Sequence, residues 1–286
     1  MPQPLSSRTP VTGYSLGNSY DQPLTRPEFA PLAMAIISGW ALVETQVGGA
    51  FVKMVGESVT PAVEIFLALQ GAGQQAALQA AAKTCLDEQG LELFEALLAL
   101  HASSAKERNR VAHWIWGTSP ALPNDALAAD PRDFLVFSAD LVKYQLAGEA
   151  ARQERWKRQF APVDHSFRTR GRAPTLEERA GWPSPDDVTQ PTIPEIPPDR
   201  ILVYTTTDFH QIRARIDRLG NHFLSFSNLL GRRTLLAQPT LDGELLRQLS
   251  TEPDVAEVLA RRRERRRNNP QSPPPQPEQP TPPSQG

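Results

Sequence analysis

Three polar side chains lie close together near the end of a predicted helix, in the segment "AKERNRVAHWIWGTSP". Arg108, Asn109 and His113 are residue types that suit cleavage of an RNA phosphodiester. An imidazole titrates near neutral pH, so it can take the proton of a 2′-hydroxyl or give one to a leaving 5′-oxygen. A guanidinium stays charged and forks onto phosphate oxygens, where it stabilises the phosphorane. Asn109, one turn before His113, can orient the imidazole or the ribose.

Each of these residues also has an ordinary explanation. A histidine in the last turn interacts well with the helix dipole, Arg108 can pair with Glu44, and Asn109 can tie down a loop. The spacing argues for a shared explanation, because Arg108 and His101 occupy positions where the helical period predicts apolar residues. The residues with this spacing of three and four are Leu91, Phe94, Leu98, His101, Ala105, Arg108 and Ala112.

Arg108 and His113 can meet at one phosphate only under particular conditions. They are five residues apart, so they differ by about 7.5 Å along the helix axis and diverge around it. They converge if the helix end is distorted or if a second copy of the chain contributes. One histidine fills one of the two proton-transfer roles, and His101 is too distant to fill the other. The sequence therefore predicts a two-fold homodimer with two Arg/His sets in one cleft.

Helical periods precede and follow this segment. A first helix keeps one apolar stripe, and Glu44 lies at the edge of that stripe, from where it can orient Arg108. The segment "RILVYTTT" is a strand candidate. It precedes a helix whose apolar spacing is unbroken from Phe209 to Leu230. His210 and His222 lie off this second stripe and are predicted to be surface residues.

The order of these elements predicts a mainly α fold, an antiparallel helical bundle with a short strand-containing insertion. Within the insertion, "DFLVFSADLVKYQL" is compatible with a strand or with a short helix. The predicted parts are a flexible leader at 1–29, a helical core at 30–125, an insertion or linker at 126–200, a closing strand and helices at 201–267, and a disordered Pro-rich tail at 268–286.

The segment "ERNRVAHWIWG" resembles the signature of the HEPN superfamily, which has an arginine, a polar residue that is often asparagine, three further residues and a histidine. The segment "GWALVE" is similar to the W-x-x-x-E start of many such domains, and the resemblance covers about residues 31–122 and 201–230. It implies a HEPN-like bundle and a dimeric, metal-independent endoribonuclease that leaves a 2′,3′-cyclic phosphate. Arg108, Asn109 and His113 would be its active residues. Many members of the family are toxins or anti-phage effectors, and others are non-catalytic binding modules.

Other side chains are candidates for contact with RNA. Arg110 and Trp116 flank the motif, and Trp116 can either stack on a base or pack into the core at the helix end. The last helix ends in a run of arginines that is either a phosphate-binding patch or a solvated helix end that suits the dipole. These arginines are Arg261, Arg262, Arg263, Arg265, Arg266 and Arg267.

Composition excludes several other classes of protein. The chain has 286 residues and a formal net charge of −2, so it is not a uniformly basic nucleic-acid coat. With one cysteine, Cys85, and no His/Cys cluster of metal-ligand spacing, the sequence predicts no disulfide, metal or cofactor. The longest apolar stretch stops at Glu44, short of the roughly 20 residues that cross a bilayer. No secretory signal is evident, so we predict a soluble, cytoplasmic protein that does not associate with membranes.

Two functions of different classes fit these observations. The first is an endoribonuclease whose partners are RNA, a second copy of the chain, and an antitoxin or regulatory protein. The second is a non-catalytic helical adaptor that binds RNA, a nucleotide or a protein partner. RNA cleavage that depends on Arg108 and His113 distinguishes the two.

Overall fold

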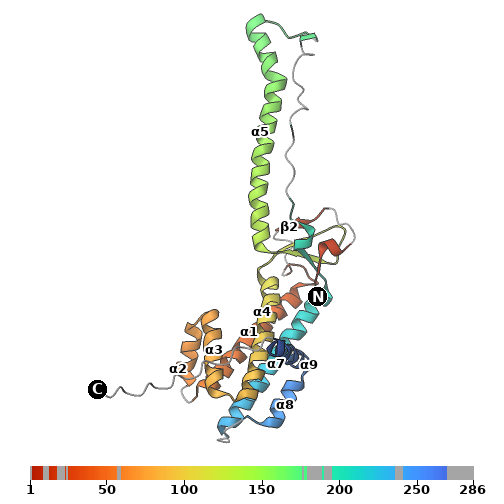
Figure 1. The fold of residues 1–286 in the computed structure, drawn as a ribbon. Coiled ribbons are helices and arrows are strands. Elements are labelled where there is room, and N and C mark those ends of the chain that lie inside the picture. The colour runs from red at the N-terminus through yellow and green to blue at the C-terminus, as the bar shows by residue number, and fades with distance from the viewer. Residues whose placement is uncertain are drawn as a thin grey trace, which may run out of the picture. The chain divides into compact units, whose positions relative to one another are not determined.

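Two compact units make up the chain, and each is built from two stretches of sequence. The sheet unit consists of Met1–Ala33 and Arg110–Phe209, and the helical unit consists of Met34–Asn109 and His210–Gly286. The fold is mainly helical with a small antiparallel sheet (Figure 1), which confirms the predicted mainly α class at this coarse level. The residues described by this computed structural model are 2–8, 13–17, 23, 25–56, 59–175, 177–178, 189, 195–235 and 241–268.

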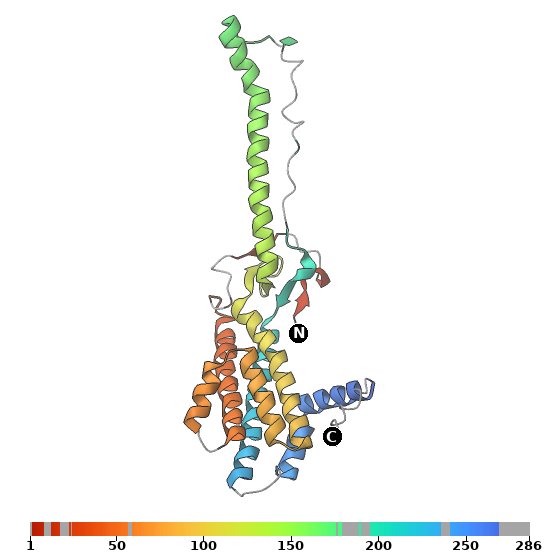
Figure 2. The ribbon, with the colours of Figure 1, turned by 60° about the vertical axis from the view of Figure 1, so that its left-hand side comes forward.

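Long helices with apolar stripes form the core of the helical unit. α1 (Ala30–Val55), α4 (Glu88–His113) and α7 (Thr206–Leu235) lie alongside one another in this unit (Figure 2). Between α4 and α7, the Phe94 ring centroid lies 5.2 Å from that of Phe226, in a stacked contact. The other helices of the unit are α2 (Val59–Ala68), α3 (Ala72–Cys85), α8 (Gly243–Thr251) and α9 (Pro253–Asn268).

The helical period predicted in α7 is confirmed, because every member of its apolar stripe is buried. The helix begins after Thr205, whose hydroxyl accepts a hydrogen bond from the Asp208 amide while the Asp208 carboxylate accepts from the Thr205 amide. This reciprocal pair satisfies two amides that the first turn leaves without helical partners. The buried stripe consists of Phe209, Ile212, Ile216, Leu219, Phe223, Phe226 and Leu230.

The predicted stripe of α1 is likewise buried, but the helix is longer than its first apolar run. It continues past Glu44 to Val55, and by length and composition alone it is apolar enough to cross a membrane. A helix at the core of a soluble bundle passes the same test, so the structure is compatible with a soluble protein and the cytoplasmic location stays a prediction. The buried stripe is Ala33, Ile36, Trp40, Val43, Val47, Ala50 and Met54.

Among the residues that the structure describes, the sheet unit contains five short antiparallel strands in the order β1-β5-β4-β3-β2. The strand predicted in "RILVYTTT" is present as β5. The predicted leader at 1–29 is not a loose segment throughout, since two of its parts pair at the sheet edges, and the predicted insertion at 126–200 supplies the central strand. The strands are β1 (Gln3–Pro4), β2 (Ser15–Leu16), β3 (Ile115–Thr118), β4 (Ala126–Ala129) and β5 (Ile201–Tyr204).

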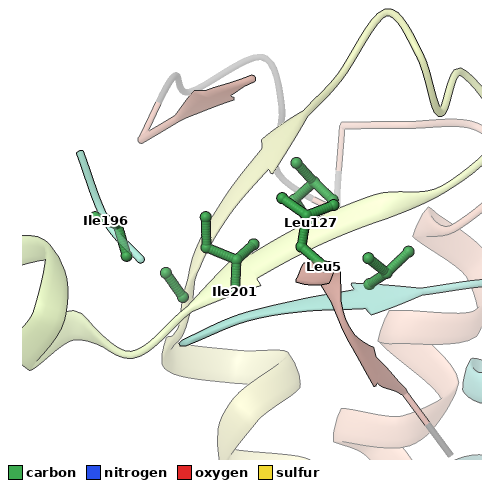
Figure 3. Packing of buried hydrophobic residues seen from close by; sticks show 6 residues of the cluster. Leu5, Leu127, Ile196 and Ile201 are labelled. Atoms are coloured by element: carbon green, nitrogen blue, oxygen red, sulfur yellow. The ribbon is translucent and has the colours of Figure 1, made fainter. Parts of the chain in front are cut away.

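Both faces of this small sheet are covered within the sheet unit. On one face, Leu5 from the N-terminal segment packs against Leu127 of β4 and Ile201 of β5 (Figure 3). Side chains alternate between faces along a strand, so Trp116 and Tyr204 lie on the opposite face, with their ring centroids 5.1 Å apart. This double burial explains why the alanine-rich β4 has no exposed residue.

The segment after β4 forms one helix of 40 residues, α5 (Pro131–Arg170). The stretch "DFLVFSADLVKYQL" is therefore neither a strand nor a short helix. Asp130 accepts a hydrogen bond from the Arg132 amide at 2.8 Å and caps the first turn. Several large apolar side chains of α5 are exposed: Leu135, Val136, Val142, Leu146, Trp156 and Phe160.

Gly117 lies in β3, shortly after α4 ends at His113. A Cβ atom added at Gly117 would lie 1.9 Å from the Ser15 carbonyl oxygen of β2. The glycine is therefore required for the close approach of these two strands.

Gly117→Ala is expected to detach β2 and to destabilise the protein by about 1–3 kcal/mol, the usual cost of overpacking. The Gly17 amide, which donates to the Trp116 carbonyl at 2.9 Å, should lose protection from hydrogen exchange. Gly148→Ala in α5 is the control, because no atom lies within 4 Å of its added Cβ, and alanine favours a helix by about 1 kcal/mol. Equal unfolding free energies and equal Gly17 exchange in the two variants would contradict the role given to Gly117.

Candidate functional site

The three motif residues all lie in the last turns of α4. Arg108 and Asn109 belong to the helical unit, and His113 is the last residue of the helix and belongs to the sheet unit. An Arg108 Nη1 atom donates to the Asn109 Oδ1 at 3.0 Å. The Arg108 Nε is buried and has no hydrogen-bond partner among the residues that the structure describes. His113 is exposed, so a partner chain can reach its imidazole.

Glu44, predicted to orient Arg108, makes its hydrogen bond with His101 instead. The His101 Nε2 and the Glu44 Oε1 are 3.3 Å apart. The His101 ring lies against Trp40 at 4.7 Å between centroids, and edge-on to Phe223 at 6.2 Å. His101 therefore occupies its apolar position with its ring partly buried against two aromatic side chains while one nitrogen reaches a carboxylate.

Several groups hold the pKa of the Glu44 carboxyl below its usual value. The hydrogen bond from His101 is the largest cause, and the charge of His101, a hydrogen bond from Trp40 and the charge of Arg108 act in the same direction. Burial opposes them and raises the pKa. Glu44 is thus an anion near neutral pH, and Arg108 lies near enough to favour that charge without a direct hydrogen bond.

These contacts bring a carboxylate, an imidazole and a guanidinium into one region of the helical unit. A carboxylate that hydrogen-bonds one nitrogen of an imidazole fixes the tautomer of the ring. Arg108 lies seven residues further along α4 than His101, about 10.5 Å along the same face, and a guanidinium is a group that can bind phosphate. His101 is too distant from His113 along the helix to act beside it, and its pairing with Glu44 is not evident from the sequence.

Glu107 is a second residue that the sequence analysis missed. It is an acidic side chain with only 8% of its surface exposed, directly beside Arg108 in the chain. The signal was present in the sequence, because α4 has a second set of positions at helical spacing that begins with Leu93 and Leu97 and reaches Glu107 and Val111. Glu107 is buried beside the motif because it lies on this second row of α4.

The predicted RNA contacts beside the motif do not all fit the structure. Trp116 is 2% exposed, and its ring packs on Tyr204 and on Phe209 in the sheet unit. A base cannot stack on a ring that is covered in this way, so the core role replaces the base-stacking role predicted for Trp116. Arg110 lies over the Trp114 ring, with 5.1 Å between its guanidinium carbon and the ring centroid.

The arginine run of α9 is largely neutralised by acids within the helical unit. Arg262 pairs with Glu95 of α4, and Arg263 pairs with Glu92 at 2.8 Å. The hydrogen bond and charge of Glu92 raise the pKa of Arg263, and Arg263 in turn lowers the pKa of Glu92. Arg266 also pairs with Glu95, at 3.4 Å, and Arg261 pairs with Glu257 in its own helix.

These ion pairs reduce the predicted phosphate patch. In the part of the chain that the structure describes, Arg265 and Arg267 are the members of the run without a recorded ion pair. The main role of the run that the contacts support is to hold α9 on α4.

Cys85 makes a hydrogen bond within the helical unit, and the described residues of metal-binding types form no cluster. The Cys85 thiol donates to the Met54 carbonyl oxygen at 3.0 Å. Among the described residues, no three His, Cys, Asp or Glu side chains gather closely enough to hold a metal ion.

The motif that resembles the HEPN signature is thus contained in one helix, and the contacts around its arginine lie in the helical unit. Known proteins add no further support for that resemblance. Comparison of the chain with family models, with curated proteins and with solved structures finds no match.

Proposed function

We propose that the protein is a metal-independent endoribonuclease of the HEPN type that acts as a homodimer in the cytoplasm, as a toxin or an anti-phage effector. The observation that carries the proposal is the state of Arg108. Its guanidinium is half-buried at the end of α4, it bonds Asn109, and its Nε has no partner among the described residues. A phosphate oxygen supplies the partner that this atom lacks.

The proposed reaction uses the motif residues in separate roles. The imidazole of His113 accepts the proton of the 2′-hydroxyl, whose oxygen then attacks phosphorus. The bond to the 5′-oxygen breaks, and that oxygen takes a proton from the His113 imidazolium of the partner copy. Arg108 stabilises the charge on the phosphorane, and Asn109 positions the guanidinium through its hydrogen bond. The products are a 2′,3′-cyclic phosphate and a 5′-hydroxyl.

The test is cleavage of RNA by the purified full chain in the presence of EDTA, with the product ends identified. Cutting should persist with EDTA and should fall by about 10²–10⁴-fold in His113→Ala, the usual contribution of a general acid or base. His210→Ala is the matched control, because His210 is an exposed histidine of α7 outside the motif. Equal cutting by the wild type and His113→Ala would exclude the proposal.

A non-catalytic adaptor is the second candidate, and the exposed apolar side chains of α5 favour it. Leu146 and Trp156 are 62% and 59% exposed, and exposed apolar side chains that gather on one surface mark sites that bind other proteins. Expression in cells separates the candidates. Growth arrest that requires both Arg108 and His113 supports the ribonuclease, and growth arrest that persists without them supports the adaptor.

A further inference from the structure

One side of α5, the long helix of the sheet unit (Figure 1), carries a row of exposed residues. Their spacing alternates strictly between four and three, so each position recurs after seven residues. That repeat is typical of a helix that pairs with another helix in a left-handed coiled coil. The row extends for about 38 Å along the helix axis. Its apolar members are Leu135, Ala139, Val142, Leu146, Trp156 and Phe160.

Two polar residues fill the middle of this row. Glu149 and Gln153 occupy the positions where the repeat would otherwise predict apolar residues, and both are exposed. In coiled coils, a polar residue on the contact row lowers stability but fixes the register and the orientation of the paired helices. The middle of the row therefore indicates which alignment a partner helix must adopt.

The row lies on the side of α5 that the chain leaves open. Tyr144 and Ala151 point to the opposite side of the helix, where Tyr144 is half-buried and Ala151 is 9% exposed. On the open side, the rings of Trp156 and Phe160 lie 6.0 Å apart between centroids and form one exposed aromatic surface. A helix of another molecule can therefore contact the whole row.

The row matches itself when it is read in reverse about the level of Ala151. Its members lie at two, five and nine residues on either side of that level. Two antiparallel copies, related by a two-fold axis there, would place apolar side chains against apolar ones and polar against polar. The facing pairs would be Leu146 with the partner's Trp156, Val142 with the partner's Phe160, and Glu149 with the partner's Gln153.

The polar pair favours the antiparallel orientation over the parallel one. A parallel pair would bring the two Glu149 carboxylates together within the contact, and like charges repel there. In the antiparallel pair, the Gln153 amide of one copy can donate to the Glu149 carboxylate of the other. A self-complementary surface of this kind fits a second copy of the same chain, since a two-fold contact uses the same residues on both sides.

Charges beside the row oppose this pairing only weakly. The antiparallel register brings Lys143 of one copy near the partner's Lys157, and both lysines are exposed. Lys143 also pairs with Asp140 of its own helix at 2.9 Å. Exposed charges are screened by solvent and salt, whereas burial of Leu146 against the partner's Trp156 removes a large apolar surface from water. The apolar contact is therefore the larger effect.

We propose that α5 pairs with α5 of a second copy of this chain in an antiparallel coiled coil, with its two-fold axis at the level of Ala151. The occupant of the exposed apolar side of α5 is then the same side of the second copy. The non-catalytic adaptor would instead place a different protein there.

This contact is separate from the dimer proposed for RNA cleavage. Ile115 pairs with Ala129, so His113 lies near Pro131, at the start of α5. Pro131 is 20 residues from the level of Ala151, and the two Pro131 residues of an antiparallel pair would be about 60 Å apart. The two His113 imidazoles of that pair could not reach one phosphate. The α5 contact therefore neither forms the cleavage site nor depends on it.

Analytical ultracentrifugation of the full-length protein tests the association. Leu146→Asp should raise the dissociation constant of the α5 contact by about 100-fold or more, because each pair loses a central apolar contact twice. Ala147→Asp introduces the same charge at the next residue, which is exposed but off the row, and should associate as the wild type does. Added salt should tighten the wild-type association by screening the facing lysines. RNA cleavage should be unchanged in both variants.

Cysteine cross-linking tests the orientation. In a Cys85→Ser background, which removes the native thiol, Glu149→Cys and Gln153→Cys chains are produced separately and together. A disulfide requires Cα atoms within about 7 Å, so co-expressed chains should form a cross-linked dimer on mild oxidation. Neither variant alone should do so efficiently. Both substitutions replace polar residues, so they leave the apolar contacts in place.

Three results would overturn the proposal. The first is an equal mass for the wild type and Leu146→Asp, which includes a monomeric wild type and would leave the row to a helix of another protein. The second is the absence of a cross-link between the co-expressed chains. The third is an equally strong cross-link in Glu149→Cys alone, which would indicate a parallel pair. Failure of RNA cleavage would contradict the proposed function and leave these outcomes unaffected.

Discussion

Replacing Arg108 with alanine is expected to slow RNA cleavage by about 10²–10³-fold, the size of effect seen when one donor to a developing oxyanion is removed. The guanidinium is half-buried, so its charge acts in a site less screened than bulk water. Its recorded hydrogen bond is the one to Asn109, at the end of α4. The helical unit should therefore stay folded, and the loss should appear in the cleavage step measured under single-turnover conditions.

Two matched variants separate the specific contact from general charge. Arg108→Lys keeps the charge but loses the planar fork, so it should recover only part of the rate. Lys106→Ala removes a cation from an exposed position two residues away on the same helix and should cut as the wild type does. Equal losses in Lys106→Ala and Arg108→Ala would show that overall charge governs the rate, which would contradict the role given to Arg108.

The candidate site shows how far helical spacing alone can place polar residues. It placed Arg108 and His101 in an otherwise apolar row, of which Phe94 and Leu98 are buried. The other members of that row are only partly buried. Helical spacing did not reveal which turn of α4 lies opposite Glu44, because His101 and Arg108 are two turns apart on one face and offer equally suitable partners. That choice depends on how α1 and α4 are offset along their axes, which the packing of Trp40 against His101 decides.

The small sheet was harder to predict than the helices, for a physical reason. β1 and β2 have two residues each, too few to show alternation, and they are held by partners distant in sequence. β3 follows α4 almost directly, so Trp116 and Gly117 resembled the end of a helix. β5 was predictable because three of its four residues, Ile201, Val203 and Tyr204, favour strands and a capped helix follows.

His222 shows a different limit of sequence analysis. The main stripe of α7 predicts correctly which face packs on the bundle. His222 lies off that stripe and was predicted to be a surface residue, but it is only 6% exposed. α8 supplies further covering on the face that carries His222, as a pocket lined by both helices shows. The period of one helix reports its largest apolar face and contains no information about a shorter helix that returns to cover another.

The aromatic cluster between α4 and α7 should contribute more to stability than any exposed apolar residue of the helical unit. Phe223 is 0% exposed, and its ring lies 6.5 Å from Phe94 and 6.2 Å from His101, edge-on to both. Phe223→Ala removes a buried ring and leaves a cavity, so the free energy of unfolding should fall by about 3–5 kcal/mol. Urea unfolding followed by circular dichroism measures the change.

Leu224 is the matched control, because it is the next residue of the same helix and is 44% exposed. Leu224→Ala removes a large apolar side chain from the same backbone environment. The helix itself is not weakened, because alanine is a better helix former than leucine. Its free energy of unfolding should change by less than about 1 kcal/mol, as is usual for surface substitutions. If both variants unfold at the same urea concentration with equal slopes, the Phe223 ring does not anchor α7 to α4, and the burial of His101 between Trp40 and that ring loses its energetic basis.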